Sequence, residues 1–362
     1  MLLKKTLVLV ALLIISKNLI SQEMSFEEYN PKSTLVVEEH LVTKARYPFI
    51  DIHSHHFNMA TQDLQVLVKS MDKMNMAVLV NLSGGSGEGL SAMLKNVNAN
   101  YPNRIVVFAN VNFDGVGGKN WGELAAKQLE TDVKNGAKGL KIYKSLGLRY
   151  NDLNGKRIAV DDPRLDPIWE KCADLNIPVL IHSADPKSFW DPMDSNNERW
   201  LELKTRPRRK RSATNPAPWE QIIQEQHNMF KKHPNTKFIN AHMGWYANNL
   251  KKLGELMDDM PNMYVGIGAI IAELGRQPKA ARTFFIKYQD RILFGKDSYK
   301  PEEFPLYFRV LETGDEYFAY YKKYHAFWAM YGLDLPDEVL QKVYFKNTFS
   351  LLKDLDKNLF EF

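Results

Sequence analysis

Two histidines lie one residue apart at the end of an apolar run, in the stretch FIDIHSHHF at residues 49–57. Because successive side chains of a β-strand point to opposite faces, Asp51, His53 and His55 would share one face of such a strand. Two imidazoles placed side by side in this way can bind one metal ion through their ring nitrogens. They can equally be two solvated loop histidines, so this stretch alone leaves both interpretations open.

The elements that would position these histidines recur along the chain. Eight apolar, β-type runs occur at residues 47–52, 76–82, 104–111, 137–143, 177–182, 236–242, 263–268 and 291–297. Segments between them, such as 61–75 and 120–136, have a helical pattern. Strands that alternate with helices predict an α/β fold with a parallel sheet. Eight such units predict a closed (β/α)8 barrel of the TIM type, and no glycine-rich dinucleotide-binding turn follows any of the runs.

Further polar side chains fall at the ends of the later strands. They are Lys141 and Tyr143 on the fourth strand, His182 on the fifth, His242 on the sixth and Asp297 on the eighth. In a barrel of this kind the active site lies at the carboxyl ends of the strands. Five of the nine histidines lie in the segments 53–56, 182 and 242. Scattered core or surface histidines would not cluster in this way, so we interpret the first-strand pair as one side of a metal site.

The order of these motifs resembles that of the amidohydrolase superfamily, in particular its amidohydrolase-related branch of metal-dependent barrels. The matching elements are DIHSH, GLKIY, VLIH, INAHMG and LFGKDS, which together span about residues 47–298. The resemblance implies a divalent ion, with zinc as the first choice, held by His53, His55, His182 and Asp297. It also implies that Asp297 moves the proton of a metal-activated water, and that His242 polarises the scissile carbonyl or holds the oxyanion.

Lys141 has two interpretations under this resemblance. In binuclear members of the superfamily a carboxylated lysine on the fourth strand bridges two metal ions, and Lys141 lies on the matching strand. The preferred alternative is binding of a substrate carboxylate or a salt bridge at the barrel mouth. Tyr143 shares a face of the strand with Lys141, and we expect it to contact the substrate as well. Around the site, we expect Asp51 to orient a ligand imidazole, His56 to pack behind the ligands and Lys144 to be structural.

Two regions exceed what a minimal barrel needs. The first, residues 185–235, follows the fifth strand, and the second, residues 301–362, is predicted to be helical, most clearly at 317–332. The inserted loop offers Trp190 and the basic residues Arg206, Arg208 and Arg209 as an aromatic and cationic wall for an anionic substrate. A solvated basic loop is the alternative, and it is the one that we favour. His325, in the aromatic segment, is expected to be structural.

Composition restricts the class of partner. The formal net charge is +5, and six positive charges lie between Lys204 and Arg211. The basicity is therefore local, unlike the broad basic face of a general nucleic-acid binder. Cys172 is the only cysteine, which excludes an internal disulfide. A small-molecule substrate is the expected partner, and the protein could also form a homo-oligomer.

The first residues predict export. Lys4 and Lys5 precede an apolar run that is shorter than the ~20 residues of a membrane-spanning helix, which is typical of a secretory signal peptide. We divide the chain into a signal peptide at 1–21, a polar lead at 22–46 and the barrel at 47–362. A periplasmic or secreted protein, not bound to a membrane after signal cleavage, is the resulting expectation.

The sequence as a whole predicts a metal-dependent hydrolase that cleaves a C–O or C–N bond of a small lactone, ester or amide through a metal-activated water. A metal-dependent, non-oxidative decarboxylase with the same ligands is the alternative, because the resembled branch includes that class. One metal ion per chain is expected, or two if Lys141 is carboxylated. An exported binding protein on an enzyme scaffold is a third hypothesis, and the intact set of site residues argues against it.

Overall fold

The computed structural model describes residues 24–25, 28–29, 31–322, 325 and 328–361. Contacts divide the chain into a first unit that ends at Val36 and a second that runs from Val37 to Phe362. The fold and the site described below belong to the second unit. The predicted signal peptide, residues 1–21, lies outside the described residues.

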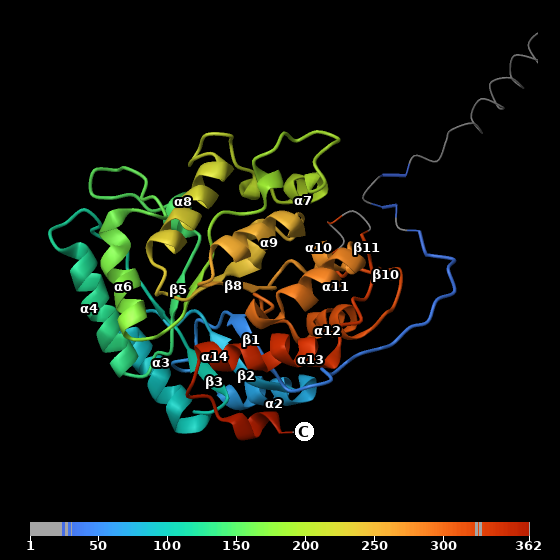
Figure 1. Cartoon of the computed structure of the whole chain (residues 1–362), viewed down its shortest axis with the longest axis horizontal. Coiled ribbons are helices and arrows are strands. Elements are labelled where there is room, and N and C mark those ends of the chain that lie inside the picture. The colour runs from blue at the N-terminus through green and yellow to red at the C-terminus, as the bar shows by residue number, and fades with distance from the viewer. Residues whose placement is uncertain (1–23, 26–27, 30, 323–324, 326–327, 362) are drawn as a thin grey trace, which may run out of the picture. The chain divides into compact units, whose positions relative to one another are not determined.

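Parallel strands alternate with helices that cover them (Figure 1). The strands are β1 (Phe49–Ser54), β2 (Met76–Asn81), β3 (Ile105–Val107), β4 (Ala109–Asn110), β5 (Leu140–Ile142), β6 (Val179–Ile181), β7 (Phe238–Asn240), β8 (Met263–Gly266) and β9 (Ile292–Leu293). Each pairs in parallel with the next along the chain, in one sheet from β1 to β3 and a second from β4 to β9. Only Phe108 separates β3 from β4, and both strands lie in the predicted run at 104–111. Each of the eight predicted runs therefore contains at least one strand.

Backbone hydrogen bonds join the two sheets at both edges. At one edge, the Phe108 N–H donates to the Asn81 carbonyl oxygen of β2. The Ala109 N–H donates to the carbonyl oxygen of Gly139, the residue before β5. At the other edge, the Ile52 N–H donates to the Phe294 carbonyl oxygen at 3.1 Å, and the Asp297 N–H donates to the His53 carbonyl oxygen at 2.7 Å. These bonds close the barrel, and the last of them fixes Asp297 beside the histidines of β1.

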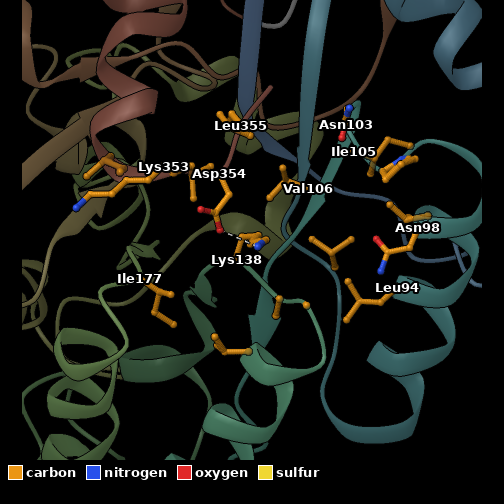
Figure 2. Close-up of a pocket in the computed structure, with 18 of the residues that line it drawn as sticks. Leu94, Asn98, Asn103, Ile105, Val106, Lys138, Ile177, Lys353, Asp354 and Leu355 are labelled. Atoms are coloured by element: carbon orange, nitrogen blue, oxygen red, sulfur yellow. Dashed lines mark hydrogen bonds and ion pairs between the residues drawn. The ribbon is translucent and has the colours of Figure 1, made fainter. Parts of the chain in front are cut away.

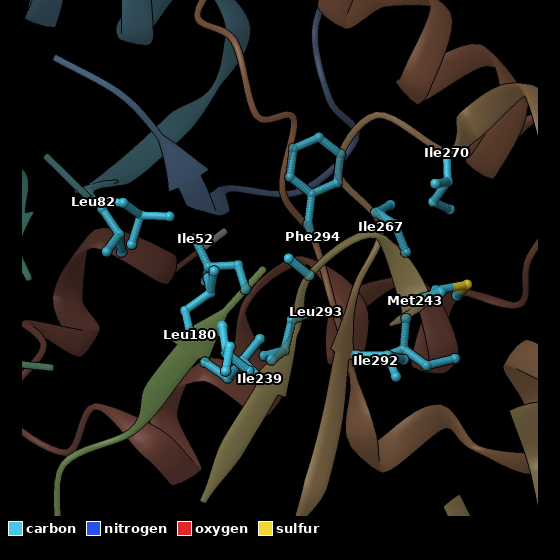
Figure 3. Close-up of a cluster of buried hydrophobic side chains, with 14 of the residues drawn as sticks. Ile52, Leu82, Leu180, Ile239, Met243, Ile267, Ile270, Ile292, Leu293 and Phe294 are labelled. Atoms are coloured by element: carbon cyan, nitrogen blue, oxygen red, sulfur yellow. The ribbon is translucent and has the colours of Figure 1, made fainter. Parts of the chain in front are cut away.

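Aliphatic side chains fill the space between the strands. Figure 3 shows Ile52, Leu180, Ile239 and Leu293 pointing toward one another, and each is at most 2% exposed. Burying one such side chain contributes roughly 1.5–3 kcal/mol to folding. This apolar packing is the rigid base from which the polar side chains at the strand ends project.

The helices have the bounds α2 (Leu64–Met74), α3 (Gly87–Asn100), α4 (Trp121–Lys134), α5 (Ser145–Leu148), α6 (Asp166–Asp174), α7 (Trp200–Thr205), α8 (Trp219–Lys232), α9 (Leu250–Asp259), α10 (Ile271–Gly275), α11 (Pro278–Lys287), α12 (Phe304–Glu312), α13 (Asp337–Gln341) and α14 (Asn347–Leu351). The predictions for residues 61–75 and 120–136 are confirmed by α2 and α4. Asp63 caps α2 by accepting the Gln65 N–H, and Asn75 ends it at a φ of 68°. Among the described residues, no helix has the length and apolar character needed to cross a membrane.

The segment between β6 and α8 is the inserted loop, and it is shorter than the predicted region at 185–235. Residues 219–232 form α8, which packs against the barrel through buried residues such as Ile222 and Phe230. The insertion proper therefore runs from the end of β6 to Pro218 and contains α7. Its Arg199 forms buried ion pairs with Glu202 and Glu273, which tie the insertion to the segment after β8.

The predicted helix at 317–332 is wrong. Two short strands, β10 (Phe318–Ala319) and β11 (Ala329–Met330), pair there in antiparallel fashion. Phe318 and Tyr320 are buried while Ala319 between them is exposed, which is the two-residue period of a strand and not the period of a helix. The other C-terminal helices are present, and α14 packs against β9.

Candidate metal centre

Three of the predicted ligands converge at the carboxyl ends of β1 and β9. One ligand atom from each of His53, His55 and Asp297 lies within 4.8 Å of the other two. The Asp297 carboxylate oxygen Oδ1 is 3.3 Å from His53 Nε2 and 3.6 Å from His55 Nε2. Two imidazoles and a carboxylate are donors that suit zinc and other divalent transition metals.

His182 reaches the site from β6 through a hydrogen-bond chain that fixes its tautomer. His242 Nδ1 lies 2.7 Å from the Gly268 carbonyl oxygen, which can only accept, so this nitrogen carries the proton. His242 Nε2 then accepts from His182 Nδ1 at 3.2 Å. The remaining nitrogen, His182 Nε2, is buried and has no hydrogen-bond partner among the described residues. A bare, buried imidazole nitrogen is what a metal ligand offers, although His182 is not one of the three residues whose donor atoms converge within 4.8 Å.

Burial keeps both members of this chain neutral. It lowers the pKa of His242 to about 4 and the pKa of His182 well below its ordinary value. His242 also stacks on Trp245 with ring centroids 4.5 Å apart. The structure therefore places His242 against His182 and leaves its predicted contact with a substrate carbonyl as a prediction.

A second chain fixes the tautomer of His55. The Tyr143 hydroxyl donates to the Leu82 carbonyl oxygen at 3.1 Å, so the Ser83 hydroxyl donates to Tyr143 at 2.8 Å. Ser83 Oγ is then the acceptor for His55 Nδ1 at 2.9 Å. His55 Nε2 is left without a proton and faces Asp297. Tyr143, which we predicted to contact substrate, thus bonds to the residue that orients a ligand.

Glycines allow His53 to reach this position. A Cβ atom on Gly295 would lie 2.9 Å from His53 Cβ, and one on Gly268 would lie 3.3 Å from His53 Nδ1. Both ring nitrogens of His53 are buried without a hydrogen-bond partner among the described residues. Asp51 does not orient an imidazole as we expected, because its Oδ1 accepts the backbone N–H groups of His53 and Lys296.

Asp297 has a backbone conformation that is rare outside glycine. Its φ is 84°, and Ala184, His242 and Ala269 also have positive φ just after β6, β7 and β8. Strained backbone of this kind costs about 1–3 kcal/mol per residue and is concentrated at functional sites. Burial opposes ionisation of Asp297, but the imidazoles around it hold the pKa of its carboxyl group well below the ordinary range. Asp297 is therefore an anion at neutral pH.

Lys141 lies inside the barrel next to these donors. It is 1% exposed, and its Nζ has no hydrogen-bond partner among the described residues. Burial lowers its pKa to about 7, while Asp297 opposes this shift and Lys144 adds to it. A mixed population of amine and ammonium at neutral pH leaves open both carboxylation and binding of a substrate carboxylate.

Two cavities meet at Asp297. The outer groove has a volume of about 600 Å³ and is lined by His55, Val66, Leu67 and Tyr299 among others. His56 also lines it and hydrogen-bonds Ser54, in agreement with a packing role. The inner cavity, of about 160 Å³, lies on the side of His182 and His242. A substrate at Asp297 can therefore extend in two directions.

The remaining predicted substrate residues divide between the cavity and the surface. Arg209 lines the inner cavity, whereas Arg206 and Arg208 are exposed and do not appear in its wall. Trp190 is buried, and its indole N–H donates to the Ala217 carbonyl oxygen. Sequence reasoning missed several lining residues because their elements are distant in the chain: Asp185, Arg199, Glu202 and Lys322. Lys144, which we expected to be structural, also lines the cavity and pairs with Asp185. For Asp185 there was a signal, since it follows His182 at a strand end.

Another cavity lies at the opposite end of the barrel (Figure 2). It has a volume of about 280 Å³ and is lined by residues that precede β5 and β6 together with the C-terminal segment 351–356. Lys138 and Asp354 in its wall form an ion pair at 3.0 Å. The catalytic end of such barrels is the carboxyl end of the strands, so we place the active site at Asp297 and not here.

A family model described as amidohydrolase matches residues 50–352 of the chain. No curated protein matches it. Solved structures with the same fold include a dihydroxybenzoic acid decarboxylase from Polaromonas sp. JS666 with bound manganese and the inhibitor 2-nitroresorcinol. That chain is 14% identical at a TM-score of 0.55, over 87% of this chain and 100% of that one.

Two further structures have comparable similarity. An uncharacterized TIM-barrel protein from Bordetella bronchiseptica is 14% identical at a TM-score of 0.52, over 84% of this chain and 98% of that one. A 4-oxalomesaconate hydratase from Rhodopseudomonas palustris is 15% identical at a TM-score of 0.50, over 86% and 97%. At these low identities the structural similarity shows the TIM-barrel fold alone, while the family match and the His–His–Asp cluster support a divalent metal site.

Proposed function

Because the chain belongs to the amidohydrolase family, we propose that it is a metal-dependent hydrolase of a small lactone, ester or amide. The observation that carries the proposal is the cluster of His53, His55 and Asp297 at the junction of two cavities. His182 would complete the donor set through its bare Nε2. Zinc is the proposed ion, because imidazole and carboxylate donors suit it.

The residues of the site divide the chemical work between them. A divalent ion in this site supplies a water of lowered pKa and polarises a substrate carbonyl. Asp297, as an anion, can accept the proton of the attacking water and later donate it to the leaving alkoxide or amine. Its side chain lies where the groove and the cavity meet, so the scissile bond is expected beside it. His242 holds the His182 tautomer that offers Nε2.

Decarboxylation is the second candidate, and the observation that favours it is Lys141. Its Nζ is next to the metal donors and has no partner among the described residues. A carboxylate bound beside Asp297 would stabilise the ammonium form of Lys141 and be held by it. In that case the carboxylate itself would be the reacting group, and CO2 would be the product.

Elemental analysis of the purified protein beside His182→Ala tests the site. About one equivalent of metal, reduced in the variant, supports a mononuclear site, and two equivalents would support a carboxylated Lys141. A panel of lactones, esters, amides and hydroxybenzoates then separates release of an acid from release of CO2. Absence of metal, even after zinc or manganese is supplied, would contradict the proposal.

Export is a separate part of the proposal. Residues 1–21 have the charge and apolar pattern of a signal peptide. Cys172 is the only cysteine, so the exported protein would fold without an internal disulfide. Fractionation of cells that express the full chain, with N-terminal sequencing of the product, tests this. A product that retains residues 1–21 in the cytoplasm would contradict it.

A further inference from the structure

The inner cavity is small and enclosed by charged side chains. Its volume of about 160 Å³ is close to the roughly 150 Å³ of an engineered protein cavity that binds benzene. It therefore admits a substituent of about six heavy atoms. The cavity opens onto Asp297, His182 and His242, so a group bound in it belongs to a substrate whose reacting bond lies at the metal donors.

Two of the three carboxylates of the cavity are already paired with cations of the protein, and the third lies at the metal site. Asp185 forms ion pairs with both Lys144 and Arg211. Glu202 bonds to Arg199, to Arg209 and to His325. Asp297 faces the imidazoles of the metal site. The wall of the cavity thus has no carboxylate left to neutralise a further cation.

Lys322 is that further cation. It lines the cavity from the segment between β10 and β11, and its ammonium group forms no hydrogen bond or ion pair with any described residue. Its Nζ lies 5.6 Å from the centre of the Tyr321 ring, which is a weak contact for a partly buried ammonium group. Burial lowers the pKa of Lys322, and Lys296 adds to this, while Glu303, Asp297 and Glu202 favour the charged form. An ammonium group taken from water without a partner is destabilising, so its position calls for an anion in the cavity.

We propose that Lys322 binds a free carboxylate of the substrate in the inner cavity and thereby makes the enzyme specific for anionic substrates. This inference rests on the proposed function, because it places the reacting bond at Asp297. A monoanion is favoured over phosphate, since one ammonium group is unpaired and the other cations already have carboxylate partners. The substrate class is a lactone, ester or amide that bears a carboxylate on the part held in the inner cavity.

Calorimetric titration of the zinc-loaded full chain with glutarate and with butyrate tests the proposal. Glutarate offers one carboxylate to the metal site and a second to Lys322, whereas butyrate has only the first. We expect glutarate to bind at least about tenfold more tightly, the usual size of one charge-assisted hydrogen bond. Lys322→Met should abolish this difference without weakening butyrate, and Lys322→Arg should keep most of it.

Lys187→Met is the control, because this lysine is exposed and pairs with Asp191 outside the inner cavity. It should retain the full preference for glutarate. Equal affinity of the unmodified protein for the two acids would overturn the proposal, and this comparison needs no variant to fold. A preference that persists in Lys322→Met would overturn the role of Lys322.

Two parallel measurements on the unmodified protein separate this inference from the proposed function. They are zinc content and hydrolysis of an uncharged aryl ester. If both are positive while glutarate has no advantage, only the carboxylate site is wrong. If both are negative, the hydrolase proposal fails, and the loss of glutarate preference in Lys322→Met remains the test of the cavity.

Discussion

At the scale of single residues, the two hydrogen-bond chains explain how neutral imidazoles present the correct nitrogen. Each chain ends on a backbone carbonyl oxygen, Leu82 in one and Gly268 in the other, and a carbonyl can only accept. The direction of every bond along the chain follows from that end. His55 and His182 therefore both carry the proton on Nδ1 and keep a lone pair on Nε2.

Ser83→Ala is predicted to weaken metal binding by about 10–100-fold, the usual effect of losing a partner of a ligand histidine. The variant removes the acceptor of His55 Nδ1, so the ring is free to rotate or change tautomer. Competition with a chromophoric chelator measures the affinity. Ser54→Ala is the control, because its hydroxyl bonds to His56, which is not a ligand. Equal affinities of the two variants would show that the chain does not orient His55.

At the scale of elements, the approach of β9 to β1 decides whether the donors meet. Asp297 and His53 are joined through their backbones at 2.7 Å, and Gly295 lies against His53 in the same strand pair. A side chain at this position would have to push the two strands apart. The site thus depends on a glycine that has no chemistry of its own.

Gly295→Ala is predicted to reduce the metal content of the purified protein by more than half, because its Cβ would lie 2.9 Å from His53 Cβ. Elemental analysis and circular dichroism would show lost metal with retained secondary structure. Gly89→Ala is the control. It lies within α3, where an added Cβ meets nothing within 4 Å, and alanine there should raise stability by up to about 1 kcal/mol. Full metal content in Gly295→Ala would contradict the prediction.

One carboxylate joins the insertion to the β10–β11 segment. Glu202 is 2% exposed and bonds to Arg199, Arg209 and His325. Burial raises the pKa of Glu202, but His325 and Arg199 outweigh this and lower it to about 2. The carboxylate is therefore ionised at neutral pH.

Glu202→Gln is predicted to lower the free energy of unfolding by up to about 3 kcal/mol, because it removes the carboxylate partner of Arg209 and one of the two carboxylates of Arg199. Hydrogen exchange should increase in α7 and in the segment from β10 to β11 more than in the barrel strands. Glu220→Gln is the matched control, since its carboxylate is exposed and 3.6 Å from Lys187. Uniform exchange across the chain, or equal stability of the two variants, would contradict this arrangement.

At the scale of the whole molecule, buried neutral histidines make the fold sensitive to acid. Burial lowers the pKa of His56, His227 and His242 to about 4 from the ordinary 6.5. Between these values the unfolded chain binds protons that the folded chain excludes. The free energy of unfolding therefore falls as the pH decreases from about 6.5 to 4, by up to ~1.4 kcal/mol per pH unit for each such histidine.

His227→Gln is predicted to make the decrease less steep, because this histidine lies in α8 and not among the metal donors. Urea unfolding at pH 7, 6 and 5 measures it. His40→Gln is a control of opposite sign. Its bond to Asp315 raises the pKa of His40, so its stabilising effect is present at acid pH and is lost as the pH rises. An unchanged pH dependence in His227→Gln would contradict the assignment.

The sequence by itself determined the barrel and the strand-end histidines. Parallel strands buried on both faces are continuous apolar runs, and a polar residue that ends such a run is at the mouth of the barrel whatever surrounds it. His53, His55 and Asp297 could be placed for this reason, and their convergence follows from closure of the barrel. The helix predicted at 317–332 is wrong because the segment has the two-residue alternation of a strand.

Only the tertiary structure decided what surrounds the metal donors. Ser83 and Tyr143 follow two different strands, β2 and β5. Arg199, Glu273 and Lys322 come from the insertion, from α10 and from the C-terminal segment. Their contacts depend on how the loops fold over the barrel, and no local period or spacing encodes such contacts. Charge is the clearest case. The basic run at 204–211 stood out in the sequence, but buried carboxylates neutralise part of it. Lys322 did not stand out, and it matters because its ammonium group lines the cavity without an ion-pair partner among the described residues.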